Sequence, residues 1–157
     1  MGRENSPSET EMLGYVEKLR IGMCFIGIFL GHMTFYRTFA ILVVSALAGV
    51  TGCESLLLSD ASARAKGWPV GTPYQLQSGC GNVALALGGI AFFLRGPSER
   101  ADAALAAVAS VTIGFIGLSG VNHAFNISKA AIHKKRAIGA ASLAFSAGWV
   151  IYKWSAF

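Results

Sequence analysis

Four stretches of this sequence are long and almost free of charged side chains, which leaves few folds open to the chain. Residues 38–59, 75–94, 103–127 and 137–152 contain one carboxylate, Glu54, and no lysine or arginine. A helix needs about 20 mostly apolar residues to cross the roughly 30 Å hydrocarbon layer of a bilayer. Three of the stretches reach that length, and the fourth approaches it. The sequence therefore predicts an all-α integral membrane protein, a bundle of transmembrane helices.

The overall composition agrees with a membrane protein, because 54% of the residues are hydrophobic and 13% are charged. Soluble domains average about 45–50% apolar and about 25% charged residues, and disordered chains are more polar still. The net charge of +5 does not indicate a nucleic-acid partner. The basic residues lie at the ends of apolar runs, where they anchor spans, and they form no basic face. The lipid bilayer is the first partner that we expect.

The amino-terminal region allows two topologies. Residues 1–11 are polar and read as a tail, and the spacing of Ser8 and Glu11 is that of a capping box at a helix start. The apolar run 21–30 is short enough for an interfacial helix. If residues 12–18 are included, with the basic side chains reaching the headgroups, the run becomes long enough to span.

Loop charge favours five spans over four with an interfacial first helix. With five, the basic residues divide nine to four between the two sides, whereas with four they divide six to seven. Cytoplasmic loops carry the excess of lysine and arginine, so five spans place the amino terminus in the cytoplasm. We predict one transmembrane domain over 12–157 in the plasma (inner) membrane. Its spans are about 12–33, 38–59, 75–94, 103–127 and 137–156.

Small residues recur at a spacing of three or four in the predicted spans. Close backbone approach through such residues drives helix association in lipid. We expect tight helix crossings at these stripes, with Gly49 at the centre of the first. The stripes include Ser45, Gly49 and Cys53, then Gly114, Gly117 and Gly120, and finally Ala140, Ala144 and Gly148.

The stretch from Gly67 to Ile90 resembles an uncharacterised family of small bacterial membrane proteins, the domain of unknown function 6790. The matching positions are Gly67, Trp68, Thr72, Pro73, Tyr74, Gln75, Gly79, Asn82 and Gly88, with Gly120–His123 near the end of the next span. The resemblance covers roughly residues 35–128 and implies five spans, but no activity. This chain has Gln77 where the family commonly has an acid, and Cys53, beside Glu54, where the family has histidine.

Polar side chains inside predicted spans are costly and indicate candidate sites. Under the five-span topology, four of them reach a similar depth in the cytoplasmic half: Glu54, Asn82, Asn122 and His123. We predict that they face one another as a ligand-binding or proton site, or as hydrogen bonds between helices. Gln77 and Asn126 are possible contributors.

No metal site and no particular cofactor are predicted. The three cysteines, Cys24, Cys53 and Cys80, fall within spans without a CxxC motif, and His32 lies at the opposite end from His123. The run of residues 133–136, HKKR, reads as a topology anchor.

Two classes of function remain open. The first is a non-enzymatic membrane protein, which binds a small ligand or serves as an accessory subunit with other membrane chains or with itself. The second is a small membrane enzyme or proton-coupled carrier that uses Glu54 and His123. Because no nucleophile motif, phosphate loop or metal cluster is present in the sequence, we favour the first class.

Overall fold

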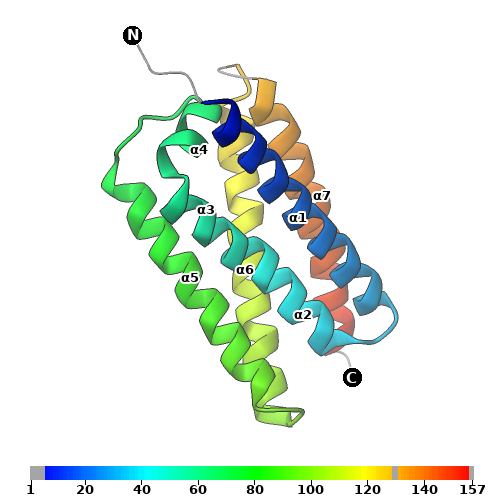
Figure 1. The fold of residues 1–157 in the computed structure, drawn as a ribbon. Helices are drawn as coiled ribbons and strands as arrows, with labels where there is room; N and C mark the ends of the chain where they lie inside the picture. The colour runs from blue at the N-terminus through cyan, green and yellow to red at the C-terminus, as the bar shows by residue number, and fades with distance from the viewer. Residues whose placement is uncertain (1–5, 129–130, 156–157) are drawn as a thin grey trace.

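The computed structural model describes residues 6–128 and 131–155, and this part of the chain forms helices joined by turns, without a strand. Figure 1 shows the helices, which are α1 (Pro7–His32), α2 (Tyr36–Val44), α3 (Thr51–Leu57), α4 (Ser59–Ala65), α5 (Pro73–Leu94), α6 (Glu99–Phe125) and α7 (Ala131–Ser155), while a π-helical segment, η1 (Ser45–Val50), joins α2 to α3. The prediction of an all-α chain is confirmed for the described residues.

The long helices run alternately up and down the bundle (Figure 1). α1 descends, α2, η1 and α3 ascend as one rod, α5 descends, α6 ascends and α7 descends. α4 and the loop after it lie at the end where α1 begins, which we call the amino-terminal end. The opposite, carboxyl-terminal end holds the turns after α1 and α5 and the end of α7.

Three helices in the described part of the chain are long and apolar enough to cross a membrane: Tyr36–Leu57, Pro73–Leu94 and Glu99–Phe125. These coincide with the second, third and fourth predicted spans. α1 contains Glu17, Lys18 and Arg20, and α7 begins with a basic run, so neither has the same apolar character.

The apolar core occupies the carboxyl-terminal half of the bundle. Phe39, Val43, Leu105 and Val150 are fully buried there, from α2, α6 and α7. Gly31 brings α1 close to this core, because an added Cβ would lie 2.5 Å from Cγ1 of Val150. α1 and α7 are thus held together at this end.

The small-residue stripes are partly where we predict them. Gly120 meets Ala140, whose Cβ would lie 2.7 Å from a Cβ added at the glycine, so α6 and α7 cross tightly at the expected stripes. Gly49 is not a tight position, since its added Cβ would make an ordinary 3.5 Å contact. The close crossing of the rod lies one turn further on, where Gly52 packs against α5 beside Gly79.

The start of α1 differs from the prediction. Ser6, and not Ser8, is the N-cap: its Oγ accepts a hydrogen bond from the Glu9 backbone N–H, and Glu9 Oε2 accepts one from Ser6 N at 2.8 Å. The capping-box motif is correct in kind but displaced by two residues. Pro7 favours this start because it fits the first helical position. The end of the tail predicted over residues 1–11 is therefore helical, and residues 1–5 lie outside the described part.

Candidate functional site

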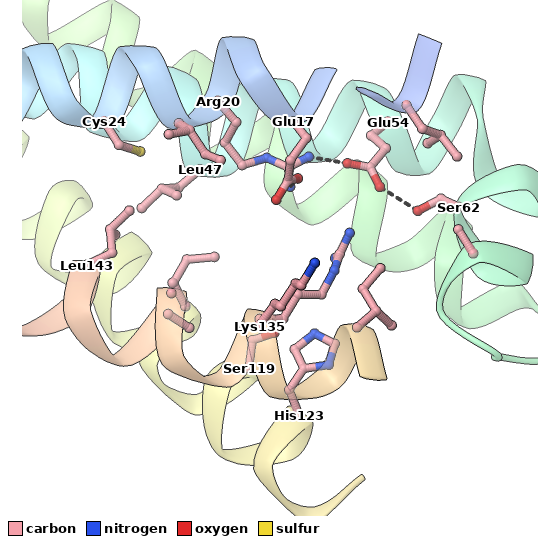
Figure 2. A pocket seen from close by; sticks show the side chains of 18 of the residues that line it. Glu17, Arg20, Cys24, Leu47, Glu54, Ser62, Ser119, His123, Lys135 and Leu143 are labelled. Atoms are coloured by element: carbon pink, nitrogen blue, oxygen red, sulfur yellow. Dashed lines mark hydrogen bonds and ion pairs between the residues drawn. The ribbon is translucent and has the colours of Figure 1, made fainter. Parts of the chain in front are cut away.

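An open cavity of about 720 Å³ lies in the amino-terminal half of the bundle and is lined by residues of α1, the rod, α4, α6 and α7. Its two ends differ in chemistry (Figure 2). Cys24, Leu47 and Leu143 form an apolar end, which Ile116 completes, whereas charged and polar side chains gather at the other end. The polar end is the one nearer the start of α1, so the cavity becomes more apolar toward the middle of the bundle.

Glu54 is the centre of a buried ionic cluster at the polar end. Its carboxylate accepts hydrogen bonds from Arg20 of α1 and Ser62 of α4, and Lys66 Nζ lies 3.1 Å from Oε1 (Figure 2 shows the first two). Arg20 also pairs with Glu17 at 2.9 Å, one turn earlier on α1. The cluster therefore ties α1, α3 and α4 together through one carboxylate that is 5% exposed.

Lys66 closes the cluster from the turn after α4. Besides Glu54, its ammonium donates to Ser62 Oγ at 2.5 Å and lies over the Trp68 ring, 5.3 Å from the centroid. Burial lowers the pKa of Lys66 below its ordinary value of 10.5, and the neighbouring Glu54 carboxylate opposes this effect. A cation is thus held in a place that solvent barely reaches.

His123 and His133 form the second polar feature. His123 lies in the last turn of α6 and His133 in the first turn of α7, and their Nδ1 atoms lie 2.7 Å apart with both rings buried. The indole of Trp68 stacks on His123 with centroids 5.6 Å apart and planes 8° from parallel. The pair joins the α6–α7 hairpin to the loop before α5.

Two cations of the cavity have no carboxylate partner. Lys135 and Arg136 both line it from α7, and no carboxylate oxygen within the described residues lies within 4.0 Å of either. Figure 2 shows Lys135 extending from α7 toward the cavity. Burial lowers the pKa of Arg136, and the more distant charges of Glu17 and Glu54 oppose this. The polar end of the cavity is therefore positively charged.

The structure brings together two of the four predicted site residues. Glu54 and His123 line the same cavity, without a bond between them. Asn82 is buried on α5 but lies outside the cavity, and its Nδ2 has no hydrogen-bond partner in the described part of the chain. Asn122 is exposed, so the prediction that it faces the other three is wrong.

The two possible contributors also lie outside the cavity. Asn126 donates to the backbone oxygen of Asn122 at 2.7 Å, a local bond at the end of α6. Gln77 is exposed on α5. Gln77 points away because it lies two residues, or about 200° around α5, from the buried Gly79. Asn126 is the C-cap, beyond the last residue of α6.

Sequence reasoning missed Arg20, Lys66, His133 and Arg136, because basic residues at span ends read as topology anchors. For His133 a signal was present: it follows His123 by ten positions, from the end of one helix to the start of the next, and at that spacing the two side chains can meet. Arg20 lies three residues from Glu17, a spacing that favours an ion pair along one helix and so a neutralised arginine.

No group of three metal-ligating side chains occurs within residues 6–128 and 131–155. Cys24 is buried beside the cavity, whereas Cys53 and Cys80 are exposed on the rod and α5. Comparison with known proteins found no matching family model, curated protein or solved structure. The resemblance to the domain of unknown function 6790 stays a prediction.

Proposed function

We propose that this chain is a five-span protein of the plasma membrane that binds a small molecule in the cavity, with its amino terminus in the cytoplasm. The three apolar spans leave α1 and α7 to be placed. Both carry large apolar side chains on their outer surfaces, including Phe25 (74% exposed) and Phe29 of α1 and Phe145 (80% exposed) of α7. Contiguous exposed apolar surface of this kind favours lipid over water as its surroundings.

The charges of α1 are compatible with a span. Arg20 turns inward and is neutralised by Glu17 and Glu54, so it need not face hydrocarbon. Lys18 lies within one turn of it on the exposed side, within snorkelling reach of the headgroups. The charged residues of α1 are thus accounted for in two ways: Arg20 and Glu17 belong to the internal ion cluster, and Lys18 lies near the membrane boundary.

The cavity carries the proposal of ligand binding. Its volume of about 720 Å³ is within the roughly 300–1,000 Å³ typical of sites for single small molecules. Such sites are mainly apolar with a few convergent polar groups, which describes the division between its two ends.

The geometry supports binding more than proton transfer or catalysis by Glu54 and His123. The Glu54 carboxylate is saturated by Arg20, Lys66 and Ser62, and Nδ1 of His123 is engaged by His133. Glu54 cannot exchange a proton with a substrate without first losing a partner, and His123 keeps only its Nε2 for such an exchange. We therefore favour a non-enzymatic binding protein, alone or as an accessory subunit beside other membrane chains.

The test is native mass spectrometry of the purified full chain, with Gly139→Leu as the blocking variant. Gly139 lines the cavity, and an added Cβ there meets nothing within 4 Å, so leucine fills space without a clash. Gly148→Leu is the matched control: it lies on the same helix and is equally open, but outside the cavity. We expect a bound small molecule on the wild type and the control, and none on Gly139→Leu. Equal occupancy of all three would contradict the proposal.

A further inference from the structure

We propose that the cavity binds a lipid phosphate with a single hydrocarbon chain, its phosphate at Lys135 and Arg136 and its chain toward Cys24, Leu47 and Leu143. This rests on the proposed ligand-binding function and names the chemical class of the ligand.

Charge balance at the polar end calls for an anion. Three cations line it, Arg20, Lys135 and Arg136, together with the carboxylates of Glu17 and Glu54, and Lys66 binds Glu54 from outside the cavity. The charges of Arg20 and Lys66 are balanced by Glu17 and Glu54, so the charges of Lys135 and Arg136 on α7 have no carboxylate to balance them.

The size and chemistry of this excess favour a phosphate monoester over a carboxylate. A phosphate monoester carries roughly −1.5 to −2 charges at neutral pH and so matches two cations, whereas a fatty-acid carboxylate leaves one unmatched. Arginine also presents a planar fork of donors that fits two phosphate oxygens at once, and lysine adds a point charge. A cationic amphiphile would meet like charges.

The apolar end accounts for the hydrocarbon chain. Cys24 lies one turn beyond Arg20 on α1, and Leu143 two turns beyond Arg136 on α7, so the lining changes from charged to apolar along the bundle axis. A lipid phosphate has the same polarity along its length. A volume of about 720 Å³ is that of a site for one drug-sized ligand, which favours one chain over the two of a bilayer phospholipid.

The test measures binding of dodecyl phosphate to the purified full chain at fixed concentration of a neutral detergent. Dodecanoate, dodecyltrimethylammonium and inorganic phosphate are compared with it. We expect dodecyl phosphate to bind about tenfold more tightly than dodecanoate, and inorganic phosphate to bind at least a hundredfold more weakly because it lacks a chain. Dodecyltrimethylammonium should not compete.

Arg136→Gln should weaken dodecyl phosphate binding about tenfold, while Lys134→Gln should change it less than twofold. Lys134 is the matched control because it is an exposed neighbour on α7 outside the cavity. Lys135→Gln provides a second variant at an exposed position, should Arg136→Gln not fold.

Each other result overturns the inference in a distinct way. Equal binding to the wild type and both cavity variants places the amphiphile elsewhere, and equal affinity for inorganic phosphate assigns the site to a free anion. If a bound molecule is found by mass spectrometry but is not displaced by dodecyl phosphate, the proposed function stands and this inference fails.

Discussion

The Nδ1 atoms of His123 and His133 lie 2.7 Å apart, so one nitrogen donates the proton of this bond and the other accepts it. The two rings cannot both carry a proton on Nδ1 in this geometry, because two N–H groups would then face each other. Trp68 stacks on both rings and keeps water from the pair. This bond therefore fixes the α6–α7 hairpin at the polar end of the cavity.

His133→Leu should reduce the free energy of unfolding by about 1–3 kcal/mol, because Nδ1 of His123 is left buried without a partner. Replacing both histidines by leucine should cost less than the sum of the single changes, which is the sign of a direct interaction. His32→Leu, at an exposed position on α1, is the control and should change stability by about 0.5 kcal/mol or less. Unfolding in mixed micelles measures all four. Strict additivity would show that the bond contributes nothing.

Glu54→Gln should cost about 3–5 kcal/mol of stability, since it keeps the shape of the side chain but removes the charge that Arg20 and Lys66 share. Lys66 would remain buried without a carboxylate partner, and Arg20 would keep only Glu17. Glu11→Gln, an exposed carboxylate on α1, provides the matched control in the same unfolding assay. If Glu54→Gln and Glu11→Gln lowered the free energy of unfolding by the same small amount, the ionic cluster would be exposed to bulk water through the cavity.

The buried ammonium of Lys66 should make the free energy of unfolding depend on pH at alkaline values. Burial lowers its pKa in the folded chain below the 10.5 of the unfolded chain, so between these values the unfolded chain binds more protons. Stability then rises with pH through that window, relative to Lys66→Gln, which cannot titrate. The measurement is the difference in unfolding free energy between wild type and variant from neutral pH to pH ~10. A difference that stays constant or falls would contradict the burial of this ammonium.

The crossing of the rod with α5 should tolerate no side chain at Gly52. A Cβ added there would lie 2.8 Å from Val83 Cγ2 and 3.0 Å from the Val83 backbone nitrogen, so Gly52→Ala forces the helices apart at a cost of about 1–3 kcal/mol. Gly81→Ala, on the open face of α5, should be neutral or slightly stabilising because alanine favours helix. Thermal unfolding of the two variants in detergent tests this, and equal melting temperatures would refute the close crossing.

The sequence predicts the parts of this fold that depend on apolar length. The second, third and fourth spans follow from uncharged runs, and their helices are found within a few residues of the predicted bounds. The shared depth of Glu54 and His123 follows from topology alone, and both line one cavity. The depth of a residue in the bilayer follows from its position along its span, so it can be predicted from the sequence.

What the sequence does not contain is the rotation of each helix about its own axis. Asn122 and His123 have the same depth, but one faces outward and the other inward. The π-helical segment Ser45–Val50 adds to this, because it changes the phase of the residues after it and so decides which side Glu54 faces. Long basic side chains are the hardest to place, since Arg20 and Lys66 reach inward from positions that equally suit the headgroups.

The five-span topology is tested by accessibility of single cysteines to a membrane-impermeant reagent, in a background where Cys24, Cys53 and Cys80 are replaced. Glu11→Cys and His32→Cys lie at the two ends of α1 on exposed positions. If α1 spans the membrane, one is labelled from inside and the other from outside. If α1 lies at the interface, both are labelled from the same side.

Lys134→Cys and Pro97→Cys supply the reference for each side, since they flank the apolar helix α6 and its turns. Glu11→Cys should follow Lys134→Cys and be labelled only when the cytoplasmic side is opened, because nine of the thirteen basic residues fall on that side with five spans. His32→Cys should follow Pro97→Cys. Labelling of Glu11→Cys together with Pro97→Cys would reverse the position of the amino terminus and leave four spans with an interfacial α1.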